Sequence, residues 1–231
     1  MIGGVGCCAL GTPALAQLWN TGPWDTRDGR PSDRTTPTSR PETRAADDLV
    51  LPIGNGSGYD ITGLSGRALA RNYSGVFAEV YADTGGVPAG TPSFTLGSSG
   101  IQVLQSGVFG QYDLLNVTLD TTGLVLTSGR WWVSLVCDVS GAAPPNDGYG
   151  FFCTAGNGVV QGNQGYYRVD GGAWTPSVTA FGYQTDFSFT VIGAQRTPQT
   201  CYANCDNSTN TPVLNILDFI CFLNSFSAGC T

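Results

Sequence analysis

Short alternating segments, separated by glycine and proline, run from residue 47 to residue 193 and constrain the fold most strongly. In four of these segments every second side chain is of the same type, and β-branched and aromatic residues are frequent; the segments are residues 76–82, 115–120, 131–137 and 187–191. This period of two, with turn residues about every eight to twelve positions, is typical of an antiparallel β-sandwich or jelly roll. No convincing helical periodicity interrupts it. We therefore expect a mostly β chain with one sandwich domain over residues 47–194.

Two missing residue types exclude several kinds of chemistry. The chain of 231 residues has no histidine, and all ten of its basic residues are arginine, so it has no lysine either. Ser-His-Asp and Cys-His catalysis, His-ligated zinc, Schiff-base lysines and P-loops each lack a required side chain. A net charge of −7 argues against nucleic acid as a partner. Hydrophobic residues make up 41% of the chain, enough for a real core.

The N-terminus predicts export. Residues 1–16 are small and apolar, and Ala14, Leu15 and Ala16 fit a signal-peptidase site with cleavage before Gln17. A disordered or partly buried N-terminus is the alternative. No later stretch reaches about 20 continuous apolar residues, so we expect no membrane span in the mature chain. The predicted location is secreted, at the cell surface or extracellular.

Residues 17–46 differ in composition from the rest. They are rich in Arg, Pro, Thr, Asp and Ser, and they hold five of the ten arginines. Such composition is typical of an irregular leading segment or linker. A second, shorter linker is expected over residues 195–200.

The cysteines fit an exported protein. Without Cys7 and Cys8 six remain, an even number that favours disulfides over a metal site; they are Cys137, Cys153, Cys201, Cys205, Cys221 and Cys230. If residues 143–147 form the tip of a hairpin around Pro145, Cys137 and Cys153 face each other on neighbouring strands. We therefore predict a bond between these two.

The last 31 residues, 201–231, form a different kind of module with four of the cysteines. An apolar stripe at helical spacing predicts a helix from Asp218 that stops near Gly229; its members are Phe219, Phe222, Leu223 and Phe226. A segment this short cannot build its own core, so two disulfides among its four cysteines are expected to hold it.

The arrangement of this tail resembles half a dockerin, one loop-plus-helix unit of the EF-hand type. The phrase from Cys201 through Leu214-Asn215-Ile216-Leu217-Asp218-Phe219 to Cys230 is similar to the Cys-rich dockerin-like tails of many secreted bacterial proteins. The resemblance implies a calcium site, with an insertion around residues 210–212, made by Asn204, Asp206, Ser208, Asn215 and Asp218. Only two of these are carboxylates, and calcium affinity follows carboxylate count. In the alternative, the disulfides hold the loop and Asp218 caps the helix.

The β region carries a fainter likeness. Its phrases are similar to those of β-sandwich ectodomains that precede such tails, which implies fold and export rather than an activity; they lie at residues 46–52, 81–88, 128–135, 170–174 and 186–193. The dockerin likeness implies a protein partner similar to a cohesin, bound through the Phe-rich helix.

Three functions follow from these features. The first is a non-catalytic adhesion, surface or extracellular-structure protein attached through its tail. The second is a carbohydrate-binding module using exposed aromatic residues, with Trp131, Trp132 and Trp174 as candidates unless loops cover them. The third is a glycoside hydrolase, for which Glu79 and Asp83 share a strand face. An exposed line of aromatics would favour the second function, and a cleft with two carboxylates would favour the third.

Overall fold

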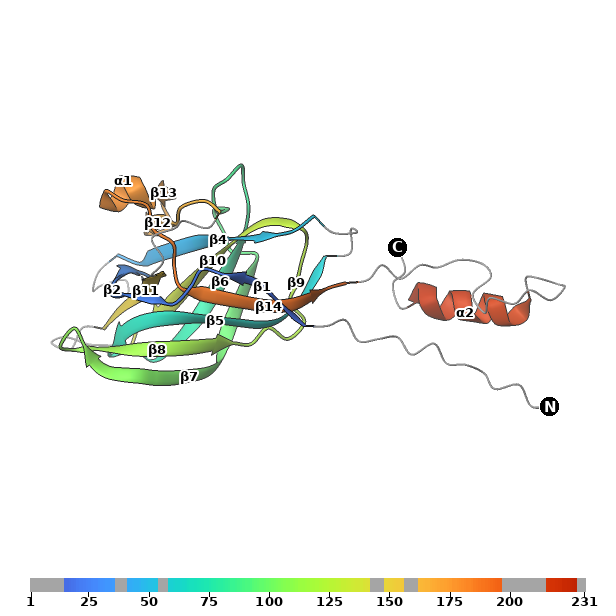
Figure 1. The fold of residues 1–231 in the computed structure, drawn as a ribbon, viewed down its shortest axis with the longest axis horizontal. Helices are drawn as coiled ribbons and strands as arrows, with labels where there is room; N and C mark the ends of the chain where they lie inside the picture. Colours follow the sequence, from blue (N-terminus) through green and yellow to red (C-terminus); the bar gives the residue numbers. More distant parts are fainter. Residues whose placement is uncertain are drawn as a thin grey trace.

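The computed structural model of the protein describes residues 15–35, 41–53, 58–141, 148–155, 162–196 and 215–227. It is mostly β, as predicted, and its strands form two layers, sheet A and sheet B (Figure 1). Sheet A contains β1 (Ala16–Asn20), β2 (Trp24–Pro31), β5 (Tyr59–Arg71), β8 (Tyr112–Leu119), β9 (Val125–Leu126), β11 (Tyr149–Ala155) and β14 (Phe189–Gln195). Sheet B contains β3 (Asp33–Arg34), β4 (Thr43–Leu51), β6 (Gly75–Ala82), β10 (Gly129–Asp138), β12 (Tyr166–Val169) and β13 (Thr175–Pro176).

One long strand, β7 (Phe94–Val108), joins the two layers. Its first residues pair with β6 in sheet B, and its later residues pair with β8 in sheet A. The order of hydrogen-bonded strands is β1-β14-β5-β8-β7-β6-β10-β3-β4-β12-β13. Outside this order, β11 pairs with β5 and β2, and β9 pairs with β5. Among the described residues every pairing of named strands is antiparallel except that of β10 with β3. Each layer therefore has one face to bury against the other.

The main hydrophobic core lies between the sheets. In β6, Val80 belongs to this core, whereas Glu79 and Tyr81 lie on the opposite face, as the alternation predicts. The layers approach closely: a Cβ atom added to Gly66 of β5 would lie 3.3 Å from Leu135 Cδ2 of β10. Two facing sheets with this packing form a single core.

The segment that the sequence predicts to be irregular, residues 17–46, instead forms strands. β1 pairs with β14, and β2 pairs with β11, so both lie in sheet A. β3 and the start of β4 enter sheet B. The sequence pattern did not predict these strands because it treats every arginine as exposed. Arg30 and Arg44 are instead buried and paired with acidic residues.

The segment that follows β11 extends sheet B and covers part of its outer face. Its strands β12 and β13 join the sheet beside β4, and the short helix α1 (Ser177–Phe181), which the alternating pattern did not predict, follows them. Tyr166 and Trp174 of this segment pack edge to face on Trp132 and Tyr81, and neither of these two sheet residues has exposed surface. The chain therefore closes this part of sheet B by itself.

Cys137 and Cys153 are both free and buried, so the predicted bond between them is wrong. β10 and β11 belong to different sheets and do not form a hairpin. Cys137 faces Gly150, where an added Cβ atom would lie 2.2 Å from Cys137 Cβ. Cys153 comes three residues later and points the other way, into a second apolar cluster on the outer face of sheet A. Burial raises the pKa of both thiols far above its ordinary value.

The described part of the tail is helix α2 (Ile216–Ser227), which begins two residues before the predicted start. Asn215 Oδ1 accepts the Leu217 N–H at 2.7 Å, and Asp218 Oδ2 accepts the Asn215 N–H at 2.9 Å. This is a reciprocal cap of the first helical turn. Two of the predicted calcium ligands are thus engaged in capping; the other three, Asn204, Asp206 and Ser208, lie outside the described residues. Calcium binding stays a prediction.

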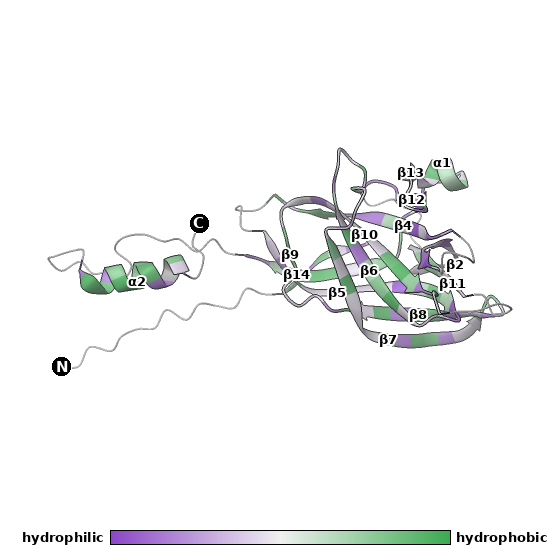
Figure 2. Ribbon diagram, turned by 180° about the vertical axis from the view of Figure 1, so that it is seen from behind, coloured by the Kyte–Doolittle hydropathy of each residue, from purple (hydrophilic) through white to green (hydrophobic). Residues whose placement is uncertain are grey.

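The apolar stripe of α2 is largely in solvent. Much of α2 is coloured as hydrophobic in Figure 2. Phe219, Leu223 and Phe226 are each about half exposed, and Phe222 stacks on Phe226 with ring centroids 6.0 Å apart. Cys221 is disulfide-bonded. The other tail cysteines, Cys201, Cys205 and Cys230, fall outside the described residues, as does the predicted signal peptide up to residue 14. In the described ranges, no helix has both the length and the apolar character needed to cross a membrane.

Candidate functional site

The outer face of sheet A, which points away from the core, is hollowed along β5. Ala68 enters the core, whereas Ser65, Arg67 and Leu69 point outward. β5 changes its neighbour along this edge, since it pairs with β14 before Arg67 and with β11 after it. The backbone N–H of Arg67 itself bonds to the carbonyl of Ser188, the residue that precedes β14. The change of neighbour separates two cavities.

The first cavity, which we call the aromatic pocket, has a volume of about 260 Å³. Its lining consists of Asp28, Gly29, Leu69, Phe109, Tyr112 and Phe151. Tyr112 of β8 and Phe151 of β11 meet edge to face with ring centroids 5.3 Å apart. Trp24 of β2 meets Phe109 in the same way at 6.0 Å. Segments distant in sequence thus hold the aromatic walls in a fixed geometry.

Phe109 stands at the mouth of the aromatic pocket in an unusual backbone conformation. Its φ angle is 52°, a left-handed value that side chains other than those of Gly, Asn and Asp rarely adopt. Burial does not explain this conformation, because 54% of the residue is exposed. Thr26 in β2, two residues before Asp28, also has a positive φ of 62°. Strained backbone beside a cavity is typical of functional sites.

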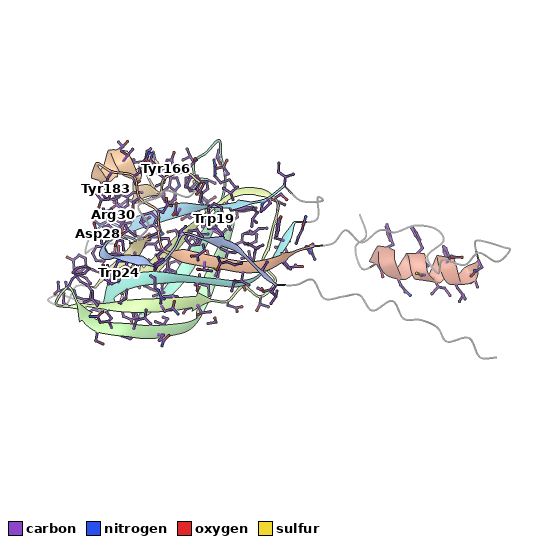
Figure 3. The ribbon with its side chains drawn as sticks, viewed as in Figure 1. Trp19, Trp24, Asp28, Arg30, Tyr166 and Tyr183 are labelled. Atoms are coloured by element: carbon purple, nitrogen blue, oxygen red, sulfur yellow. The ribbon has the colours of Figure 1, made fainter. Side chains whose placement is uncertain are left out.

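Asp28 is the acidic group of the aromatic pocket, and its neighbours fix it in place (Figure 3). Its Oδ2 accepts hydrogen bonds from Arg30 Nη1 at 2.7 Å and from the Tyr183 hydroxyl at 3.0 Å, and its Oδ1 accepts the Gly29 N–H at 2.8 Å. The Arg30 guanidinium also lies 4.4 Å from the ring centroid of Phe181. A carboxylate offers about four acceptor positions, so one remains for a ligand hydroxyl.

The second cavity, which we call the arginine pocket, has a volume of about 290 Å³ and a more polar lining. Its side-chain lining includes Asn20, Pro23, Ser65, Arg67, Asn116 and Thr190. Arg67 and Asn116 stand opposite each other in the ladder between β5 and β8. The Arg67 guanidinium forms no hydrogen bond or ion pair with any residue that the structure describes, and its Nη1 is buried. Such an unpaired cation is the distinctive feature of this pocket.

The predicted ligand-binding residues lie elsewhere. Trp132 is fully buried and donates its indole N–H to Asp83 at 2.9 Å, and Trp174 donates to the Ala89 carbonyl at 3.0 Å. The structure brings Trp132 and Trp174 together around Tyr81, on the outer face of sheet B. Trp131 is partly buried and packs at the edge of the main core. None of the three lines either cavity.

The two carboxylates considered for hydrolysis are engaged in internal contacts. Glu79 forms a buried ion pair with Arg44 at 2.7 Å and accepts the Tyr81 hydroxyl. Asp83 accepts the indole N–H of Trp132. Both lie on the outer side of sheet B, where the covering segment packs.

Two further carboxyls lie on β4 with raised pKa values. The pKa of Asp47 is well above its usual value because the group is buried and Asp186 lies nearby. Burial also raises the pKa of Asp48, although Arg130 Nε lies 2.9 Å from Asp48 Oδ2. Within the described ranges, no group of three or more acidic or cysteine side chains is arranged to hold a metal.

Sequence reasoning missed all the residues that line the two cavities. The dipeptide Phe109-Gly110 was the available signal, because an aromatic residue at a turn between two strands has no core to enter. Asp28 gave no signal, since it lies in the segment that was assigned to a linker. Arg67 gave none either, because an isolated arginine on a strand face is most often solvated.

Comparison with known proteins leaves the family open. No family model matches the chain, and no curated protein matches it. Among solved structures, it is similar to the cysteine protease and lectin-like domains of Cwp84, a surface layer associated protein of Clostridium difficile. That match has 15% identity and a TM-score of 0.39, and it covers 67% of this chain and 32% of the other. A second structure, clostridial cysteine protease Cwp84 after propeptide cleavage, gives 16% identity, a TM-score of 0.39, and coverage of 67% and 36%. The chain thus spans about a third of these proteins.

Proposed function

We propose that this protein is a non-catalytic, carbohydrate-binding β-sandwich and that the aromatic pocket is its ligand site. One observation carries the proposal: Phe109, which is exposed and has a strained backbone, lines an aromatic cavity together with the fixed carboxylate of Asp28. Of the functions that the sequence allowed, carbohydrate binding accounts best for this arrangement, with other aromatic residues than those expected.

The chemistry of the pocket suits a sugar. A pyranose ring has an apolar C–H face and a rim of hydroxyl groups. Phe109 and Tyr112 supply flat apolar surface for the first, and Asp28 supplies an acceptor for the second. A cavity of about 260 Å³ is below the range of drug-sized sites and matches a single sugar ring.

Binding without hydrolysis follows from the same lining. Glycoside hydrolysis uses two carboxyl groups about 5 to 9.5 Å apart on either side of the scissile bond. Among the described residues, Asp28 is the one carboxylate that lines the aromatic pocket, and it is already paired with Arg30. Asp28 already accepts hydrogen bonds from Arg30, Tyr183 and Gly29, which suits it to accept one more from a ligand.

A surface location belongs to the same proposal. The predicted signal peptide would export the chain, and the dockerin-like tail would attach it to a surface or to a protein scaffold. The half-exposed apolar side chains of α2, such as Phe219 and Phe226, support an attachment role because they have no cover among the described residues. A cohesin-like partner and a calcium ion in the tail remain parts of this proposal.

Affinity electrophoresis of the full chain through gels that contain one polysaccharide each tests the carbohydrate site. We expect at least one polysaccharide to retard the protein, and we expect Phe109→Gly to abolish the retardation. Glycine adopts a positive φ without strain, so this variant removes the ring and keeps the turn. Leu104→Ala is the matched control, because Leu104 is an exposed apolar residue of β7 outside the pocket.

Two results would contradict the proposal. One is migration unaffected by every neutral and acidic polysaccharide in the panel. The other is retardation that Phe109→Gly leaves unchanged, which would place the sugar site elsewhere on the molecule.

A further inference from the structure

The arginine pocket contains the positive charge of Arg67, which forms no ion pair with any residue that the structure describes. Arg67 has no ion pair or side-chain hydrogen bond with any described residue, and Nη1 has lost its contact with water. Leaving a buried charged donor without an acceptor costs stability, and native structures rarely keep one without a reason. Asp28 does not neutralise it, because that carboxylate is bound to Arg30. The site therefore lacks an acceptor that a ligand would supply.

The surroundings of Arg67 favour a small oxyanion. Asn116 and Ser65 lie on the same outer face, opposite and beside Arg67, and neither side chain has a hydrogen bond within the described part of the chain. An amide, a hydroxyl and a guanidinium around one cavity offer several donors to the oxygens of one group. The net charge of −7 means that the protein as a whole does not attract anions. Anion binding therefore requires a local feature such as this pocket.

The two cavities adjoin each other. Arg67 of the arginine pocket and Leu69 of the aromatic pocket are two residues apart on one face of β5, which places them about 7 Å apart. On the other side, Pro23 lines the arginine pocket, and the next residue, Trp24, contacts Phe109 of the aromatic pocket. The two cavities therefore lie next to each other on the outer face of sheet A.

We propose that the ligand is an acidic glycan, and that Arg67 in the arginine pocket binds its carboxylate, sulfate or phosphate group. This inference rests on the proposed function, because the aromatic pocket would hold the neutral ring of the same molecule. Arg67 then determines specificity for charged over neutral glycans. A guanidinium binds oxyanions through paired N–H donors, which gives both affinity and direction.

Titration calorimetry of the full chain with four probes tests this inference. The probes are an oligogalacturonide, the same oligomer with its carboxyl groups reduced to neutral hydroxymethyl groups, a sulfated galactan oligomer, and inorganic phosphate. We expect an acidic oligomer to bind about 10- to 100-fold more tightly than the reduced one, as a charge-assisted hydrogen bond predicts. The probe that binds most tightly identifies the anionic group.

Substitutions separate this inference from the proposed function. Arg67→Gln should bring the acidic oligomer down to the affinity of the reduced one without lowering the melting temperature, because it removes an unpaired charge. Arg196→Gln is the matched control, since Arg196 is half exposed and paired with Asp60. Equal binding of acidic and reduced oligomers, unchanged in Arg67→Gln, would overturn the acidic-glycan inference and leave the carbohydrate site standing. Oligomer binding that Phe109→Gly leaves intact would instead contradict the proposed function.

Discussion

Both outer faces of the sandwich carry arginine and aromatic side chains, but these are packed against each other on one face and partly unpaired on the other. On sheet B, Arg168 donates to the Tyr81 hydroxyl at 2.9 Å and lies 4.4 Å from the ring centroid of Trp174. On sheet A, Arg67 has no such partner within the described residues, and the ring of Phe109 is exposed. The segment after β11 covers part of one face, and the other face carries two cavities beside an apolar cluster of its own.

This difference shows that residue type alone does not reveal a binding face. An arginine among aromatic rings stabilises the fold when its donors are satisfied, as those of Arg44 are by Glu79. The same residue type indicates a ligand site when its donors are unpaired beside a cavity. We therefore expect the face with paired arginines to serve stability and the face with the unpaired Arg67 to serve binding.

The largest expected effect is on the stability of the covered face. Glu79→Gln removes the buried counter-charge of Arg44 and leaves it only the half-exposed Glu42, whose Oε2 lies 3.4 Å from Nη2. Breaking a buried pair in this way costs about 3–5 kcal/mol of unfolding free energy. Urea denaturation followed by tryptophan fluorescence measures it. Arg67→Gln is the comparison on the open face, with no expected loss. Equal destabilisation by the two substitutions would remove the distinction between the faces.

Stability should also depend on pH through Asp47, between the sheets. Burial and the nearby Asp186 raise the pKa of Asp47 in the folded state, whereas the unfolded chain has the ordinary value. Between these two pKa values the folded state binds more protons, so the free energy of unfolding falls as pH rises and stays lower above the folded pKa. Asp47→Asn should flatten this slope in urea denaturation measured at several pH values.

The exposed carboxyl of Asp60 provides the control for this measurement. Asp60 is half exposed and pairs with Arg196, so Asp60→Asn is the matched substitution of a carboxyl outside the core. An Asp47→Asn variant with an unchanged slope would show that Asp47 is not the group responsible.

Phe109→Gly should weaken glycan binding at least about tenfold, as expected for removal of a central aromatic contact. Its stability should stay equal or increase, because the positive φ of Phe109 is relieved. Calorimetry and thermal unfolding on the same samples separate the two effects. A variant that loses binding and stability together would make Phe109 a structural residue.

Tyr183→Phe should give the smallest effect. It removes the hydroxyl that donates to Asp28 at 3.0 Å, a contact at the surface, and leaves the Arg30 pair intact. A hydrogen bond of this kind contributes about 0.5–1.5 kcal/mol, so glycan affinity should fall about 2- to 10-fold. Unchanged affinity would show that Asp28 needs no support from Tyr183.

The sequence predicted the architecture better than the site. Period-two patterns located β6, β8 and β10, because their core residues alternate with outward ones. The same reasoning could not place Asp28 beside Phe109, since their proximity depends on how β2 and β7 sit in the sheet. It also failed for Cys153, because the face that a cysteine occupies depends on which sheet its strand joins. Register and sheet membership are tertiary properties that local patterns do not contain.

Chemical-shift mapping by NMR tests the central claim most directly, with the glycan that binds most tightly titrated into isotope-labelled full chain. The account predicts shifts for amides around the two cavities, such as Gly29, Leu69 and Gly110, and none for Ala46 or Gly90 near the covered rings of sheet B. Shifts confined to the covered face, or to α2 alone, would contradict it.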